Sequence, residues 1–184
     1  MIHIIQFGST KTPLFSKILN ELDLEHQIIP HDDYSPEIIT KASGLILSGA
    51  PVLVTEIDYS DYLEKYRFLI NPPIPVLGVC FGHQLIGLVH GASCHKTEAD
   101  RDFRIIHQKA PSILFKDIEQ DTAFRQDHCE GVTVPKGFTL TADSAICKNE
   151  AMEHEALKLY GVQFHPEASG EVGQQLIYNF TALI

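Results

Sequence analysis

Two short, nearly continuous apolar runs, at residues 44–48 and 75–79, constrain the fold of this 184-residue chain most strongly. An uninterrupted apolar run of this length is typical of a strand that is covered on both faces. Strands of this kind belong to parallel sheets that carry helices on each side. The two runs therefore predict the centre of a buried parallel sheet.

Strands and helices alternate around these runs over the first 90 residues. Residues 2–6 and 26–30 predict two more strands. Between them, Thr12 as an N-cap and Pro13 in the first turn begin a helix with apolar residues at helical spacing. Further helices are expected from residue 35 and over residues 59–70. The alternation predicts a doubly wound α/β fold, with a mostly parallel sheet and helices on both faces.

The pattern changes after residue 103. Short β-like segments at residues 104–107, 131–134, 138–142 and 157–163 are separated by turns, which indicates a small antiparallel extension of the sheet. A last amphipathic helix is expected over residues 171–183. We find no internal repeat or long linker, so we expect residues 1–184 to form one domain.

Charge and composition exclude several functions. The chain has 14 Lys and Arg residues against 24 Asp and Glu residues, a net charge of −10, which argues against nucleic-acid binding. No apolar run is long enough to predict a membrane span. The first residues read as a strand and not as a signal peptide, so we expect a cytoplasmic protein. The four cysteines form no Cys-x-x-Cys pair, and His90, Cys94 and His95 lack further ligands at zinc spacing, so we expect no metal site.

The most informative motif is Gly-Val-Cys-Phe-Gly-His-Gln, at residues 78–84. It follows a predicted buried strand and begins an apolar helix. A nucleophile between two glycines at such a junction is typical of a nucleophile elbow. Cys80 would then lie at a helix N-terminus, which favours the thiolate, and the N–H of Phe81 could stabilise an oxyanion.

A second motif, Gly-Val-Gln-Phe-His-Pro-Glu, stands at residues 161–167. The proline holds the preceding His165 extended and so fixes its direction. A cysteine nucleophile needs a base, and that base needs an acceptor to orient it. Glu167 can reach the second ring nitrogen of His165 if the turn folds back.

With both motifs in this order, the chain resembles the class I, or triad, glutamine amidotransferases. The resemblance implies a flavodoxin-like fold. The resemblance implies that Cys80 is the nucleophile, His165 its base and later acid, and Glu167 the group that orients His165. It also implies that Gln84 lines the glutamine pocket. The substrate would be glutamine, which is cut to glutamate and ammonia through a thioester.

A third segment, Leu-Ser-Gly-Ala-Pro at residues 47–51, resembles the family's Leu-Ser-Gly-Gly-Pro, whose backbone supplies the other oxyanion N–H. Gly49 or Ala50 would provide that group here. Ala50 departs from the family's second glycine. An alanine there is strained by roughly 1 kcal/mol if the position requires a positive φ.

Residues 127–138 resemble a Ser-His-x-Asp-x-Val…Pro-x-Gly-Phe segment of GMP synthetases and suggest that Asp127, His128 and Cys129 bind substrate. Asp127 replaces the serine and Glu130 the aspartate of that pattern. Gln6 and Thr10 also replace an aspartate and a glutamine in the family's opening segment.

The resemblance implies the glutaminase subunit of a two-subunit GMP synthetase. Its partner would be an ATP pyrophosphatase that aminates XMP and that itself binds ATP and Mg²⁺, so no cofactor is expected on this chain. The alternatives are the amidotransferase subunit of anthranilate synthase, a stand-alone γ-glutamyl hydrolase, or a non-catalytic binding module on the same fold.

Overall fold

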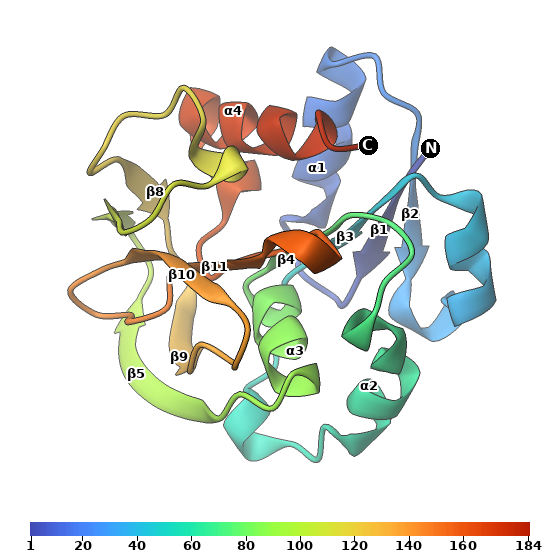
Figure 1. Cartoon of the computed structure of the whole chain (residues 1–184), viewed down its shortest axis with the longest axis horizontal. Helices are drawn as coiled ribbons and strands as arrows, with labels where there is room; N and C mark the ends of the chain where they lie inside the picture. The colour runs from blue at the N-terminus through green and yellow to red at the C-terminus, as the bar shows by residue number, and fades with distance from the viewer.

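An eight-stranded sheet forms the centre of the computed structural model, which describes residues 1–184 apart from the side chain of Pro36. Its strands stand in the order β2-β1-β3-β4-β12-β11-β10-β7 (Figure 1). In that order they are β2 (His26–Pro30), β1 (Ile2–Gln6), β3 (Gly44–Leu47), β4 (Val76–Val79), β12 (Leu159–Val162), β11 (Ala151–His154), β10 (Thr139–Asp143) and β7 (His107–Gln108).

The sheet has a parallel part and an antiparallel part. The pairs from β2 through β1, β3 and β4 to β12 are all parallel. The pairs from β12 through β11 and β10 to β7 are all antiparallel. The predicted fold class is therefore confirmed. Placing residues 157–163 in the antiparallel extension was only half right, because β12 is fully buried and pairs in parallel with β4 on one side.

Four helices cover the two faces of the sheet. Helices α1 (Thr12–Glu21) and α4 (Gly170–Thr181) lie side by side on one face, while α2 (Ser60–Lys65) and α3 (Phe81–Val89) lie on the other (Figure 1). The buried residues Phe15 of α1 and Phe180 of α4 share a core with Ile4 of β1. On the opposite face, Leu85 of α3 packs in a second core with Leu47 of β3. The sheet is thus covered on both faces, as its apolar strands require.

The helix predictions need three corrections. Thr12 is the first helical residue of α1 and not its N-cap, which is Lys11. The helix expected over residues 59–70 divides at Tyr66 into α2 and the 3-10 helix Arg67–Ile70. Tyr66 is fully buried and stacks on Tyr34, so core packing decides where the helix breaks. The helix expected from residue 35 is a 3-10 helix, Pro36–Lys41.

Two small antiparallel sheets stand beside the antiparallel strands. One pairs β5 (Cys94–Asp100) with β9 (His128–Val132), and the other pairs β6 (Phe103–Ile105) with β8 (Ala123–Arg125). The remaining elements are short 3-10 helices: His31–Asp33, Val54–Glu56, Ile113–Phe115, Glu155–Leu157 and Pro166–Ala168.

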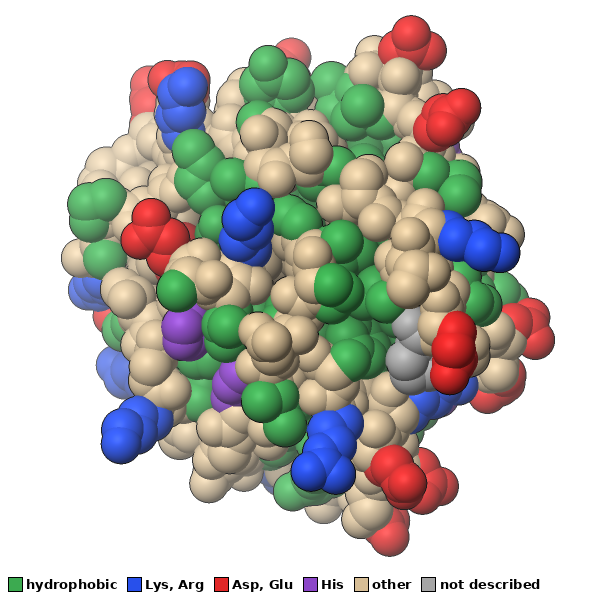
Figure 2. Space-filling model, turned by 45° about the vertical axis from the view of Figure 1, so that its right-hand side comes forward, with side chains coloured by type: hydrophobic (Ala, Val, Ile, Leu, Met, Phe, Trp, Pro, Cys, Tyr) green, Lys and Arg blue, Asp and Glu red, His purple; other side chains and the backbone are tan. Residues whose placement is uncertain are grey.

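The surface carries both signs of charge. Figure 2 shows apolar side chains near the middle of one face, with Lys, Arg, Asp and Glu side chains separated around them. Among the described residues, no helix combines the length and the apolar character that a membrane crossing needs.

Candidate active site

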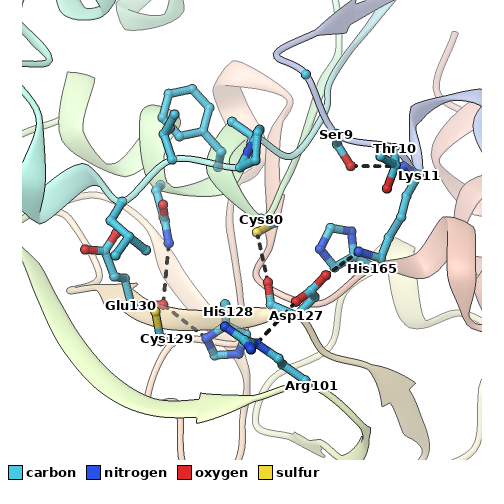
Figure 3. Close-up of a pocket in the computed structure, with 17 residues that line it drawn as sticks. Ser9, Thr10, Lys11, Cys80, Arg101, Asp127, His128, Cys129, Glu130 and His165 are labelled. Carbon is cyan, nitrogen blue, oxygen red and sulfur yellow. Dashed lines mark hydrogen bonds and ion pairs between the residues drawn. The ribbon is translucent and has the colours of Figure 1, made fainter.

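A cavity of about 400 Å³ lies at the edge of the sheet where β1, β3, β4 and β12 end. This is the edge at which open α/β sheets bind ligands. Segments that follow these four strands form much of the wall, and Arg101, Asp127 and the start of β9 complete it (Figure 3). The lining residues are Gly8, Ser9, Thr10, Lys11, Ala50, Pro51, Val52, Leu53, Cys80, Phe81, Gln84, Arg101, Asp127, His128, Cys129, Glu130 and His165.

Cys80 stands on the sharp turn between β4 and α3, where it is the N-cap of the helix. Its backbone has φ 52° and ψ −105°, a strained combination for a residue with a side chain. The two flanking glycines are required by space. A Cβ at Gly78 would lie 2.5 Å from the Gly82 carbonyl oxygen, and one at Gly82 would lie 2.2 Å from that of Leu47. The elbow expected from the sequence is therefore present, with the Cys80 side chain in the cavity wall.

His165 and Glu167 form a buried pair. Residues Pro166–Ala168 form a 3-10 turn that folds the carboxylate back, so that His165 Nδ1 lies 2.7 Å from Glu167 Oε1. The His165 backbone N–H donates to the carbonyl of Arg125 at 2.8 Å, which holds the His165 backbone in position. The turn geometry expected from the His-Pro-Glu spacing is thus observed.

His165 and Cys80 face the same small space. A Cβ built at Gly49 would lie 3.1 Å from His165 Cε1 and 3.5 Å from Cys80 Cβ, so only glycine leaves this gap open. Burial alone would lower the pKa of the His165 imidazole. Cys80 and Glu167 outweigh burial and raise that pKa well above its ordinary value, which favours the imidazolium.

The segment after β3 does not carry the strain expected for Ala50. Ala50 is absent from the residues with positive φ in the described chain, so the alanine costs no backbone strain and that conditional expectation does not apply. Ala50 lines the cavity, and Gly49 adjoins Cys80 and His165. In the described chain, the N–H groups of Gly49 and Ala50 have no hydrogen-bond acceptor from the protein. The Ala50 N–H, on a residue that lines the cavity, is therefore available to a bound group, whereas Gly49 is not itself a lining residue.

Gln84 and Glu130 shape the floor and wall of the cavity. The Gln84 amide donates to the Glu130 carbonyl at 3.4 Å and to Gln163 Oε1 at 3.2 Å. The Glu130 carboxylate accepts the N–H groups of Val54 at 2.7 Å and of Thr55 at 3.0 Å. Glu130 therefore positions a loop through its side chain, a role that the sequence did not indicate.

Asp127, His128 and Cys129 all reach the cavity wall. Cys80 Sγ lies 4.0 Å from the Asp127 carbonyl oxygen. His128 Nδ1 and Nε2 each lie 3.1 Å from an oxygen, those of the Glu130 carbonyl and the Gln126 amide, and burial lowers the pKa of His128. The three residues are thus near the nucleophile, and their binding roles remain predictions.

The sequence missed two cationic residues of the site, Lys11 and Arg101. The Lys11 ammonium pairs with Asp127 Oδ2, and Arg101 Nε lies 3.9 Å from Asp127 Oδ1. Partial burial by itself raises the pKa of Asp127, but Lys11 lowers it below its ordinary value. Lys11 could have been found from its place after the first strand, since ligand-binding residues gather at strand ends. No local pattern singles out Arg101.

Comparison with known proteins points in one direction. The family model described as "Glutamine amidotransferase class-I" matches residues 3–183. A protein from Methanocaldococcus jannaschii, named as one subunit of a glutamine-hydrolyzing GMP synthase, is 32% identical over 98% of this chain and 95% of its own length. The glutamine-hydrolyzing GMP synthase of Bacillus pumilus is 37% identical over 98% of this chain, which spans 35% of that longer relative.

Solved structures agree with the sequence matches. A structure from Thermoplasma acidophilum, assigned as one subunit of a GMP synthase, superposes with a TM-score of 0.88 at 27% identity. The superposition covers 99% of this chain and 92% of that one. A glutamine amidotransferase structure from Thermotoga maritima, with a TM-score of 0.79 at 18% identity over 98% of this chain and 82% of that one, shares the fold.

Proposed function

The chain belongs to the class-I glutamine amidotransferase family, and we propose that it hydrolyses glutamine at Cys80 and supplies the ammonia to a synthetase subunit. The acceptor in this proposal is XMP, which is aminated to GMP. One observation carries the chemistry. The strained Cys80 lies beside His165, and the Nδ1 atom of His165 contacts the buried carboxylate of Glu167. This is the arrangement that an activated nucleophile needs.

The first half of the reaction forms a thioester. The Cys80 thiolate attacks the side-chain amide carbon of glutamine, and the amide oxygen takes up the negative charge. The N–H groups of Phe81 and of Ala50 or Gly49 hold that oxyanion. The His165 imidazolium gives its proton to the departing nitrogen, so that ammonia leaves and a glutamyl thioester remains on Cys80.

The second half of the reaction releases glutamate. His165, now neutral, takes a proton from water, and the resulting hydroxide attacks the thioester carbon. The carbon–sulfur bond breaks, glutamate leaves, and the thiolate and imidazolium are restored. Glu167 holds the His165 ring by its Nδ1 side, which leaves the other nitrogen to move the protons.

Binding of the substrate is assigned to the cavity that contains Cys80. Its volume of about 400 Å³ is in the range of small-ligand sites. Gln84, Asp127, His128 and Cys129 line this space and would contact the glutamine.

The identity of the partner rests on similarity. Relatives named as one subunit of GMP synthase match the chain over nearly its full length. In our proposal the partner is an ATP pyrophosphatase subunit that binds ATP, Mg²⁺ and XMP. Ammonia passes to it directly, since ammonia released to water at neutral pH becomes ammonium, which is no nucleophile.

Glutamate production tests both parts of the proposal. The chain is incubated with glutamine alone, and then with an ATP pyrophosphatase subunit, XMP, ATP and Mg²⁺, the subunit being taken from the same organism. Glutamate and GMP should form together only in the complete mixture or much faster there, and Cys80→Ala should stop both. Equal glutamate release with and without the partner would instead indicate a free hydrolase.

A labelling experiment tests the nucleophile separately. A glutamine-like electrophile that alkylates thiols should modify Cys80 and spare Cys94, Cys129 and Cys147, all of which are free thiols in the described chain. Burial raises the pKa of Cys94 and of Cys147, so their thiolates are scarce at neutral pH. Equal modification of all four residues would refute a special role for Cys80.

A further inference from the structure

Three charged side chains meet at the cavity that contains Cys80. The Lys11 ammonium pairs with one carboxylate oxygen of Asp127, and Arg101 approaches the other at 3.9 Å. Figure 3 shows Lys11 and Arg101 reaching toward Asp127 from different sides. Lys11 is largely covered, Asp127 is half-exposed and Arg101 is mostly exposed. The cluster therefore presents both signs of charge where a ligand can still reach them.

The other carboxylate and imidazole side chains that line the cavity already have partners in the protein. The Glu130 carboxylate accepts two backbone N–H groups, as described above. The two ring nitrogens of His128 both have partners, and His165 Nδ1 meets Glu167. Lys11 and Asp127 pair only with charged side chains of the cluster itself, and the Asp127 and Arg101 side chains stay accessible, so this cluster can exchange partners with a charged substrate.

The cluster and the nucleophile line the same cavity. The Asp127 backbone carbonyl is 4.0 Å from Cys80 Sγ, and the Asp127 carboxylate pairs with Lys11. In glutamine, only the short aliphatic side chain separates the reactive amide from the α-carbon. A glutamine whose amide carbon stands at Cys80 therefore has its charged α-carbon end in the cavity that Lys11, Arg101 and Asp127 also line.

Lys11 and Asp127 are also matched to each other. They are 116 residues apart in sequence and come from separate segments, one after β1 and the other before β9. Lys11 is the N-cap of α1, whose N-terminus adds partial positive charge on the same side. The Lys11 wall therefore favours an anion, and the Asp127 carboxylate favours a cation.

We propose that Lys11 and Asp127 recognise the zwitterionic α-carbon end of glutamine, with Lys11 and Arg101 meeting the α-carboxylate and Asp127 accepting from the α-ammonium. This inference rests on the proposed glutaminase function. The two residues satisfy each other before substrate binds, and the substrate supplies opposite charges to both. They act on specificity, since they select free glutamine over amides that lack either charge.

Three substrates separate the two contacts. Glutamine carries both charges, 4-carbamoylbutanoate lacks the α-ammonium, and 4-aminobutanamide lacks the α-carboxylate. The value of kcat/KM is measured for each with the wild type and with the variants Asp127→Asn and Lys11→Met, in the presence of the partner subunit if activity requires it.

The two variants should each lose activity on a different pair of substrates. Asp127→Asn should lower kcat/KM by roughly 10- to 100-fold for glutamine and 4-aminobutanamide, mainly through KM, and much less for 4-carbamoylbutanoate. Lys11→Met should weaken glutamine and 4-carbamoylbutanoate instead. Lys109→Met removes a surface ion pair with Asp143 and serves as the matched control, with no change expected for any substrate. Equal losses on all three substrates would overturn the proposal.

A charge-swapped double variant excludes a merely structural role. Lys11→Asp combined with Asp127→Lys restores an ion pair across the cavity but reverses its direction. A structural role predicts that glutamine hydrolysis recovers, whereas our proposal predicts that it stays low. Thermal unfolding of each variant identifies any that fails to fold.

Binding keeps the proposal testable if no turnover is seen. Calorimetric titration of glutamine into Cys80→Ala should give a Kd that rises by roughly 10-fold or more with Lys11→Met or Asp127→Asn. Normal binding in both Cys80→Ala/Lys11→Met and Cys80→Ala/Asp127→Asn would refute the recognition role alone. Glutamine binding by the wild type without turnover, even in the complete mixture with the partner subunit, XMP, ATP and Mg²⁺, would refute the glutaminase proposal and leave the recognition role supported.

Discussion

The carboxylate of Glu130 accepts the backbone N–H of Val54 at 2.7 Å and so ties β9 to the loop that follows β3. Thr55 adds its own N–H at 3.0 Å and its hydroxyl to the same carboxylate. Glu130 is 2% exposed, so these bonds replace its hydration. The pairing fixes one wall of the cavity, because the loop before Val54 also carries Ala50.

Removing this carboxylate should loosen the wall. We expect Glu130→Ala to lower the free energy of unfolding by about 2–3 kcal/mol, because two N–H groups lose a charged acceptor. Glutamine KM should rise as well. Urea unfolding measures the first effect. Glu56→Ala, which removes an exposed carboxylate paired with Lys96, is the control and should stay within about 0.5 kcal/mol. Equal losses in the two variants would contradict the assigned role.

Glu167 should set the pH range of glutamine hydrolysis. Cys80 and Glu167 raise the pKa of His165 against the opposing effect of burial, so the imidazolium that protonates the leaving nitrogen persists to high pH. Glu167→Gln removes one of these charges and should lower that pKa. The alkaline limb of the kcat/KM profile should therefore move to lower pH, and kcat should fall by roughly 100-fold or more.

The pH profile of kcat/KM for Glu167→Gln can also contradict this role. A variant with reduced kcat but an unmoved alkaline limb would mean that Glu167 orients His165 without setting its charge. Glu171→Gln changes a nearby carboxylate in the first turn of α4 and provides the control. Its profile should match that of the wild type.

Glu150 should make stability depend on pH. It is fully buried, one of its oxygens has no partner among the described residues, and burial raises its pKa from 4.5 to about 7. Because the folded state holds this proton more tightly, the stabilisation is complete below pH 4.5 and is lost as pH rises through 7. The difference corresponds to about 3 kcal/mol.

Glu150→Gln isolates this contribution. The variant mimics the protonated form, so its free energy of unfolding should resemble that of the wild type near pH 5 and exceed it by about 2–3 kcal/mol at pH 8. Chemical unfolding at both pH values measures the change. If the free energies of unfolding of the wild type and of Glu150→Gln differed by the same amount at both pH values, a raised pKa for Glu150 would be refuted.

Much of the parallel sheet could be predicted from the sequence. Strands β1 and β2 were predicted to the residue, and β3 and β4 to within one residue. For β3 and β4 the reason is that short apolar runs bounded by turns have clear ends. Strand β5 was not predicted. Only Asp100 among its residues is buried, so it shows neither an apolar run nor a simple alternation.

The active-site residues likewise divide into those that local motifs predict and those that depend on distant contacts. The positions of Cys80, His165 and Glu167 follow from two local motifs, since the elbow and the folded-back turn are made by adjacent residues. The ion pair of Lys11 with Asp127 joins residues 116 positions apart and depends on the tertiary fold that brings the segment after β1 beside the segment before β9. No local pattern carries that information.

The Cys80 backbone is strained, and this strain should be measurable as a difference in stability between two variants. Its φ of 52° with ψ −105° suits glycine and costs a residue with a Cβ roughly 1–3 kcal/mol. Cys80→Gly removes that cost, although glycine also gains about 0.5–1 kcal/mol of entropy in the unfolded chain. Cys80→Ala keeps the Cβ and therefore the strain. We expect Cys80→Gly to be about 1 kcal/mol more stable than Cys80→Ala, with both variants inactive, as measured by urea unfolding and glutamate release. An alanine variant that is more stable than the glycine variant by about 0.5–1 kcal/mol, the entropy penalty of glycine alone, would mean that the turn stores no strain.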